Sequence, residues 1–320
     1  MATFTAELLD RPAVAAASTV ALAYLDDAVA AAERLGDRRD SEALHDFRVA
    51  IRRLRLTVRA YPGVHEAISR KHRGRLRKLA RATNAARDAE VQVAWFTSHA
   101  NRFTATERAA LGPLRARLRA RRRKELAATQ QKLRQRFARI ERKLRRRLSA
   151  LRDDAGAHEP PFRAVAAATL VQHARELRAR LGETSSSSAA AELHATRIAA
   201  KRLRYLMEPV EPGLPNGNRL TLRLKDLQDL FGELTDAHEL EPVLQDGNDG
   251  KAAAAKVLRG EVAAQFRRLQ EEWSTAGADL ERDVQAAAQQ LRPLPRAPRA
   301  QQAPRSVQQR TRRRARDVTV

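Results

Sequence analysis

Apolar residues recur every three or four positions along most of the chain, in tracts separated by proline, glycine and serine. This spacing places the apolar residues of each tract on one face of an α-helix. Alanine, leucine, arginine, glutamate and glutamine dominate these tracts, and all of them are strong helix formers. Runs rich in β-branched residues are missing, so we predict an all-α protein without strands. The expected helices span residues 12–35, 41–60, 65–86, 89–101, 113–152, 162–181, 189–208, 218–233 and 251–290.

Several helix boundaries are predicted from capping residues and helix breakers. Ser41 is the expected N-cap of its helix, because a hydroxyl accepts a hydrogen bond from the free N–H groups of a first turn. Asp88 and Asp236 are expected to begin the helices that follow them, the second with the spacing of a capping box. The last tract is expected to break near Gly260 or Gly277, because glycine disfavours the interior of a helix.

One phrase occurs twice in the chain. LHDFRVAIRRLR at 44–55 returns as LHATRIAAKRLR at 193–204, a shift of 149 positions, and both copies keep His-x-x-Arg-x-x-x-(Arg/Lys)-x-x-Arg. The order of the surrounding helices repeats as well, and Asp88 aligns with Asp236 at a shift of 148. A period this long indicates a duplication into two pseudosymmetric helical bundles, not a solenoid of short repeats. The halves are assigned to about 12–155 and 162–290, within a domain of residues 10–290.

The charged residues of each phrase form a stripe along its helix. Because a helix advances about 100° per residue, Arg48, Arg52 and Arg55 fall on the same side of the wheel as His45. Apolar residues border the stripe on both sides, so we expect it to line a channel or groove while its flanks pack on neighbouring helices. The flanking residues are Leu44, Phe47, Ile51, Leu54, Val58, Val49 and Leu56 in the first copy and Leu193, Leu203, Met207, Ile198 and Tyr205 in the second, and the outward face is expected around Asp46, Arg53 and Thr57.

The cost of burying unpaired cations limits what such a stripe can do. One interpretation is that carboxylates from other helices pair with it. The other is a wet groove that recruits an external anion, and we favour it because neither phrase carries an acid on its stripe before Glu208. The acids available for pairing from other helices are Asp88, Asp226, Asp229 and Asp236.

The composition also favours an anionic partner. The formal net charge is +24, from 62 Lys and Arg against 38 Asp and Glu, and arginine, the commoner cation, binds phosphate through two parallel hydrogen bonds. A charge of this size indicates nucleic acid, a membrane surface or an inorganic polyanion as partner. The chain has no cysteine, which excludes disulfides and thiolate metal sites. We expect no transmembrane helix and no signal peptide, and therefore a cytoplasmic protein without a membrane partner.

Basic residues outside the phrases are distributed unevenly. The helix after the first phrase adds cations at helical spacing, whereas its counterpart in the second half is less basic. The segment 113–152 is basic all round, and we interpret it as a solvated helix because no single narrow face emerges. Residues 291–320 are arginine-rich without apolar periodicity, so we expect a disordered tail. Solubility and nonspecific affinity for a polyanion both remain open as its role.

The paired histidines, His45 and His194, are weighed as metal ligands and as phosphate ligands. A protein metal site normally uses three or four ligands, and the two halves supply only two histidines. We therefore favour phosphate hydrogen bonding or helix packing, and we expect no metal and no cofactor. Other histidines lie outside the repeated phrase and are expected at the surface; they are His65, His72, His99 and His158.

At these residues the chain resembles the CHAD family, the conserved-histidine α-helical domain. The matching segments are LHDFRVAIRRLR at 44–55, LHATRIAAKRLRYLMEP at 193–209, LKDLQDLFGELTDAHEL at 224–240 and, more weakly, NAARDAEV at 84–91. The resemblance implies two pseudosymmetric helical bundles around a central basic pore, binding of inorganic polyphosphate and location on polyphosphate granules. On this resemblance and the stripe, the predicted polyphosphate-binding residues are His45, Arg48, Arg52, Arg53, Arg55, Arg59, Arg73, Arg77, Arg81, His194, Arg197, Lys201, Arg202, Arg204, Arg219, Arg223 and Lys225.

We do not expect an enzyme. Some CHAD proteins carry a triphosphate-tunnel (CYTH) domain with a Glu-x-Glu-x-Lys motif, and no such motif occurs in this sequence. No acidic cluster is evident that would hold a catalytic metal for phosphoanhydride cleavage. Two alternatives stay open: nonspecific nucleic-acid binding by the segment 113–152 and the tail, and metal chelation by the histidines. The scarcity of aromatic residues for base stacking counts against the first. The oligomeric state is not predicted.

Overall fold

A computed structural model describes residues 2–37, 40, 42–154, 156, 159–185, 188–245, 249–273 and 276–291. The described residues form helices, together with one isolated bridge between Pro12 and Pro161 and no strand, which confirms the all-α prediction. The α-helices are α1 Ala13–Arg34, α2 Ala43–Ala60, α3 Pro62–Ala67, α4 Arg70–Ala82, α5 Asn84–Ser98, α6 Ala105–Ala110, α7 Gly112–Asp153, α8 Phe162–Glu183, α9 Ala190–Met207, α10 Gly217–Leu244, α11 Asp249–Trp273 and α12 Ala276–Leu291. The short 3-10 helices are η1 Ala6–Asp10, η2 Ala100–Arg102 and η3 Glu211–Gly213.

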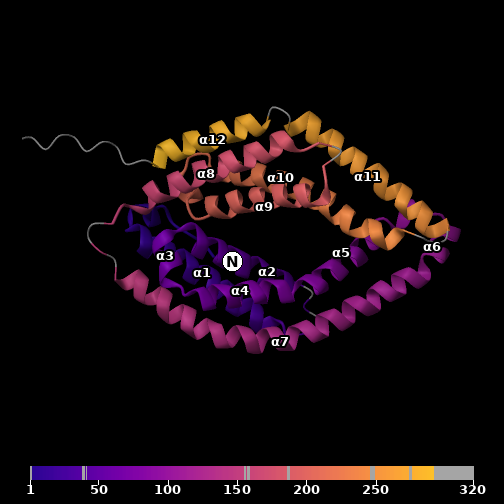
Figure 1. Cartoon of the computed structure of the whole chain (residues 1–320), viewed down its shortest axis with the longest axis horizontal. Helices are drawn as coiled ribbons and strands as arrows, with labels where there is room; N and C mark the ends of the chain where they lie inside the picture. The colour runs from indigo at the N-terminus through magenta and orange to yellow at the C-terminus, as the bar shows by residue number, and fades with distance from the viewer. Residues whose placement is uncertain are drawn as a thin grey trace, which may run out of the picture.

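The helices lie in two layers within an elongated molecule (Figure 1). In the N-terminal layer, α1 packs against α2 and α7, and α4 packs against α2 and α7. In the C-terminal layer, α8 packs against α9 and α12, and α9 packs against α10. The layers touch where α2 meets α9, where α1 meets α8, and at the far end, where α5 meets α10 and α6 meets α11.

Some predicted boundaries were wrong. The tract 65–86 is divided, because Ile68 and Ser69 adopt extended backbone between α3 and α4. Asp236 does not begin a helix, since α10 runs continuously through it and its carboxylate accepts a hydrogen bond from Arg197. Asp88 likewise lies inside α5.

Other boundaries were predicted well. The last tract breaks between α11 and α12, next to Gly277 and not at Gly260. Helix α2 ends at Ala60, as predicted, whereas α3 begins at Pro62 and not at residue 65, because proline is well suited to the first helical position. Ser41 and the tail 292–320 lie outside the described residues, so neither of those predictions is tested.

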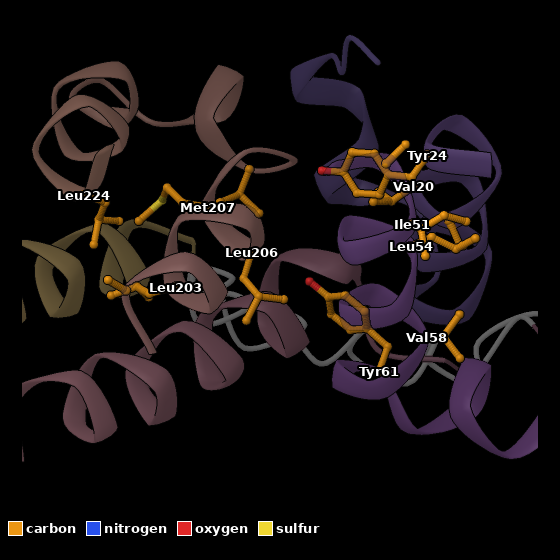
Figure 2. Close-up of a cluster of buried hydrophobic side chains, with 14 of the residues drawn as sticks. Val20, Tyr24, Ile51, Leu54, Val58, Tyr61, Leu203, Leu206, Met207 and Leu224 are labelled. Carbon is orange, nitrogen blue, oxygen red and sulfur yellow. The ribbon is translucent and has the colours of Figure 1, made fainter. Parts of the chain in front are cut away.

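The main hydrophobic core extends through both layers. Figure 2 shows Tyr24 of α1 and Tyr61 on one side of it, with Leu206 and Met207 of α9 on the other. The ring of Tyr61 also packs against Phe162, with 5.2 Å between ring centroids. Because these contacts exclude water from the junction, they hold α2 and α9 at a fixed separation.

Helix α1 supplies the centre of this core. Its alanine-rich faces are buried against α2, α7 and α8. By length and composition alone it is the one described helix apolar enough to span a membrane, but 61% of its most apolar window is buried inside the protein. The apolar residues of α1 therefore pack against neighbouring helices of the protein.

A second, smaller core closes the end of the molecule where α5, α6, α7, α10 and α11 converge. Trp95 of α5 stacks there on His99, the residue that follows this helix, with 4.6 Å between ring centroids, and the Trp95 indole donates a hydrogen bond of 3.0 Å to Glu261 of α11. His99 contacts the same carboxylate. His99 is therefore a packed residue, and its predicted surface position was wrong because helix α11 covers it.

Candidate anion-binding site

The stripes of α2 and α9 face one another across the junction of the two layers. Arg52 lies near their centre, since its positive charge lowers the pKa of both Lys201 and His194 on the opposite helix. The same charge lowers the pKa of Arg48 and Arg55 on its own helix. The repeated phrase thus brings cations from two distant parts of the sequence into one site.

The apolar flanks predicted for the stripe are confirmed on its core-facing side. Phe47, Ile51 and Leu54 of α2 are fully buried, and so are Leu193 and Leu203 of α9. This burial fixes the rotation of both helices. The charged stripe is half-buried as a result, which leaves its cations partly shielded from water.

Lys201 is the most strongly perturbed cation of the site. Burial lowers its pKa to about 6, and the charges of Arg197 and Arg52 add to the effect, opposed by Asp236. At neutral pH the amine is therefore mainly neutral. An anion placed beside it would favour the charged form.

Arg48 is held at the start of α5. Its guanidinium donates hydrogen bonds to the Thr83 hydroxyl and, over 3.3 Å, to the Asn84 side-chain oxygen. Burial and the charges of Arg52 and Arg87 lower the pKa of Arg48 to about 10. The group therefore stays charged at neutral pH, and both of its hydrogen-bond partners are neutral.

Arg197 occupies the corresponding place on α9, and it is only partly compensated. It donates a hydrogen bond of 3.2 Å to Asp236 of α10. Its guanidinium lies over Gly232, where an added Cβ would come within 3.3 Å of Nη2. Its buried Nε has no hydrogen-bond partner among the described residues. One buried donor of Arg197 thus remains unpaired in the free protein, and the absence of a side chain at Gly232 makes room for the guanidinium.

Acidic residues lie at the α5–α10 end of the stripe. Burial raises the pKa of Asp88, and the negative charge of Asp236 adds to the increase. Glu239 has a raised pKa for the same reasons, with Asp88 and Asp236 both contributing. Asp88 and Asp236, which the sequence predicted as helix caps, therefore approach each other beside the cations Arg48 and Arg197.

Helix α4 adds cations at the opposite end. The pKa of Arg55 is lowered by burial and then by Arg77, Arg52, Arg81 and Arg59. Of these, Arg77 and Arg81 lie on α4, at positions that the sequence predicted on the helix after the first phrase, whereas Arg52 and Arg59 lie on α2. In the described part of the chain none of these five arginines forms an ion pair, so this end of the stripe is the more positive one.

Several predicted site residues lie elsewhere. Arg223 donates a hydrogen bond of 2.6 Å to Asp283 of α12, and Lys225 pairs with Asp229 at 3.1 Å. Arg219 lines a surface depression with Arg223 and residues of α12. The predicted contribution of α10 was therefore placed on the wrong surface, since these side chains point toward α12 or solvent.

Three other predicted residues have structural partners. Arg202 pairs with Glu176 of α8 at 3.2 Å. Arg73 donates to the backbone carbonyls of His65 and Ile68, and so ties α4 to the end of α3. Arg204 lies near Glu208 at 4.0 Å and over the Tyr205 ring at 4.7 Å. Arg204 still contributes to the electrostatics of the stripe by lowering the pKa of Lys201, and burial and then the charge of Arg59 lower the pKa of Arg202.

Arg53 joins the two layers. It donates a hydrogen bond of 2.7 Å to Glu208, which also accepts one of 3.3 Å from the Tyr24 hydroxyl. The guanidinium lies 5.2 Å from the Tyr205 ring centroid, and the Arg53 side chain is only 11% exposed. The expected outward face around Arg53 and Thr57 was therefore wrong, because it packs against the second layer.

The site also includes one arginine that the sequence analysis did not assign. Arg87 of α5 lowers the pKa of Arg48 and of His45, and it lies 3.6 Å from Glu90. Burial is the larger cause of the lowered pKa of His45 and of His194, so both histidines are neutral at pH 7. The described residues contain no group of three or more His, Asp or Glu side chains placed to hold a metal ion.

Fold and site together define an all-helical protein with a half-buried cationic cluster between two helices of repeated sequence. A CHAD domain family model matches residues 19–245, so the chain belongs to the CHAD domain family, a family associated with polyphosphate binding. The crystal structure of the CHAD domain from the plant Ricinus communis is similar, with a TM-score of 0.62 and 23% identity over 91% of this chain and 98% of that one. A search of curated protein sequences gave no match.

Proposed function

We propose that this protein binds inorganic polyphosphate along the facing stripes of α2 and α9. The observation that carries the proposal is the concentration of half-buried cations around Arg52, which depress one another's pKa values and have few acidic partners. Such an arrangement is costly in the free protein. A bound polyanion offsets that cost by supplying one negative charge for each cation.

We extend the proposal to the internal duplication. Two related halves would each contribute one stripe to a shared basic pore, with His45 and His194 as hydrogen-bonding groups at its rim. Linear polyphosphate fits a line of cations spaced about one helical turn apart better than duplex nucleic acid does. A duplex takes a helix into its major groove, which is about 12 Å wide, and is itself too wide to enter between two facing helices. Scarce aromatic residues argue against a single-stranded nucleic acid.

Cellular location and chemistry are part of the same proposal. We propose a cytoplasmic protein that associates with polyphosphate granules and does not cleave its ligand. A fluorescently tagged chain is expected to collect on granules in cells that form them and to stay diffuse in cells that do not. Incubation with polyphosphate and Mg²⁺ is expected to release no phosphate, and release above background would overturn the non-enzymatic interpretation.

The binding test uses two double variants that each remove two basic side chains. Arg52→Gln with Lys201→Met removes cations from the stripe, whereas Arg259→Gln with Arg267→Gln removes exposed cations from α11. Labelled polyphosphate is titrated at physiological salt, with duplex DNA of equal phosphate content as competitor. The stripe variant is expected to lose most of its affinity and the control to keep it. Equal loss in both variants, or equal competition by DNA, would refute a specific polyphosphate site.

A further inference from the structure

A second group of cations lies on the outer side of α4, where this helix packs against α7. Burial and then the charges of Arg75, Lys143, Arg147 and Lys71 lower the pKa of His72, so all four cations lie close to this one ring. Lys71, Lys143 and Arg147 are exposed. We call Lys71, Arg75, Lys143 and Arg147 the outer basic surface.

The outer basic surface has no acidic counterpart. None of its four cations forms an ion pair with any acid in the described ranges. By contrast, Arg145, two residues from both Lys143 and Arg147 on α7, pairs with Glu141 and with Asp26. Arg139 continues the line of exposed cations along α7, four residues before Lys143. The four clustered cations therefore repel one another in the free protein, as those of the stripe do.

Helix α4 connects the outer basic surface with the stripe. Arg77 and Arg81 lie on its inner side, where they lower the pKa of Arg55. Lys71 and Arg75 lie on its outer side. At about 100° per residue, exposed Lys78 falls between the two sets. Gly74 has no neighbouring atom within 4 Å of an added Cβ, so the surface between the two sets is open.

We propose that the outer basic surface is a second polyphosphate-binding surface, which engages only chains long enough to leave the stripe and pass over α4. This inference rests on the proposed function and adds a preference for long chains. A flexible linear polyanion can follow cations around one helix, whereas duplex DNA resists bending over such a distance because its persistence length is about 50 nm. None of the four residues of the outer basic surface is a phenylalanine, tyrosine or tryptophan on which bases would stack.

The test compares short-chain with long-chain polyphosphate on two variants of the full chain. The outer variant carries Arg75→Gln, Lys143→Gln and Arg147→Gln, and the stripe variant carries Arg52→Gln and Lys201→Met. We expect the outer variant to bind short chains like the wild type and to bind long chains about tenfold more weakly, with a salt slope smaller by about 2, since each lost phosphate contact removes about 0.7. The stripe variant is expected to lose both ligands.

The outcomes separate this inference from the proposed function. Wild-type affinity of the outer variant for long chains, or an equal loss for short and long chains, would overturn the second surface while leaving the stripe intact. Undiminished binding of short chains by the stripe variant would instead refute the proposed function. Loss of duplex DNA binding with full retention of long-chain polyphosphate binding would assign the outer basic surface to nucleic acid and overturn the inference. Circular dichroism and the midpoint of urea unfolding show whether each variant is folded.

Discussion

Replacement of Lys201 by methionine tests the electrostatic argument most directly. Folding lowers the pKa of this amine from 10.5 to about 6. Between these values the unfolded chain holds one proton on Lys201 that the folded protein does not hold. The free energy of unfolding therefore rises with pH, by about 1.4 kcal/mol per pH unit from this group. The penalty of burying the charge is complete below pH 6 and is lost by pH 10.5.

Lys201→Met removes this contribution and leaves the other titrating groups in place. The variant is expected to be more stable than the wild type at pH 7, because methionine buries without a charge. Its advantage is expected to shrink as pH rises, by about 2 kcal/mol between pH 7 and pH 8.5. Urea unfolding followed by circular dichroism, at intervals of half a pH unit, measures the difference.

Lys201→Arg provides the matched control. Arginine keeps its charge throughout this pH range, so the control is expected to retain polyphosphate binding and to be less stable than Lys201→Met at every pH. A stability difference between wild type and Lys201→Met that does not change with pH would refute the reasoning. It would mean that Lys201 remains protonated in the folded protein, and that the stripe tolerates all of its charges without a ligand.

Three further predictions concern ligand binding and the junction of the layers. Polyphosphate binding at pH 7.5 is expected to take up close to one proton on Lys201, so calorimetric enthalpies should depend on the ionisation enthalpy of the buffer; no such dependence would contradict the lowered pKa. Gly232→Ala is expected to displace Arg197 and weaken binding about threefold, while the free energy of unfolding changes by less than about 1 kcal/mol because alanine favours the helix. Arg53→Met is expected to lower the free energy of unfolding by up to about 3 kcal/mol, because Glu208 loses its nearest cation and keeps only the Tyr24 hydroxyl and the more distant Arg204, with polyphosphate affinity unchanged. A double variant with Glu208→Leu should recover most of the loss, and a failure to recover would show that packing of the arginine dominates.

Much of the fold was predictable because it depends on local periodicity. Even α7 follows this periodicity: residues such as Leu133, Phe137, Leu144 and Leu148 are buried at helical spacing, and α7 packs against α1 and α5. The interpretation of 113–152 as a solvated helix without a narrow face was therefore wrong, because the many arginines around it obscured its apolar face. The stripe was predictable for the same reason, since helix geometry alone places Arg48, Arg52 and Arg55 on one side. Neither prediction requires knowledge of which residues the neighbouring helices contribute.

The remaining features depend on contacts between segments distant in sequence. Arg53 was expected to face outward, and only the approach of Glu208 from α9 shows that it is buried. Asp236 has the residue type and spacing of a helix cap, but its carboxylate accepts a hydrogen bond from Arg197 instead of capping a helix. Arg87 follows a break in backbone direction between α4 and α5, so the periodicity of α4 does not extend to it. A cation or an acid carries no local signal that identifies its partner.

The two ends of the stripe differ in counter-charge, and this difference gives the proposed site a direction. At the α5–α10 end, Asp88 and Asp236 already oppose the charges of Arg48 and Arg197, so a polyanion must compete with them. At the α4 end, Arg55 has only cations among the charges that shift its pKa. A phosphate there gains attraction without displacing a carboxylate. We therefore expect polyphosphate to bind most strongly at the α4 end, which is also the end that leads to the outer basic surface.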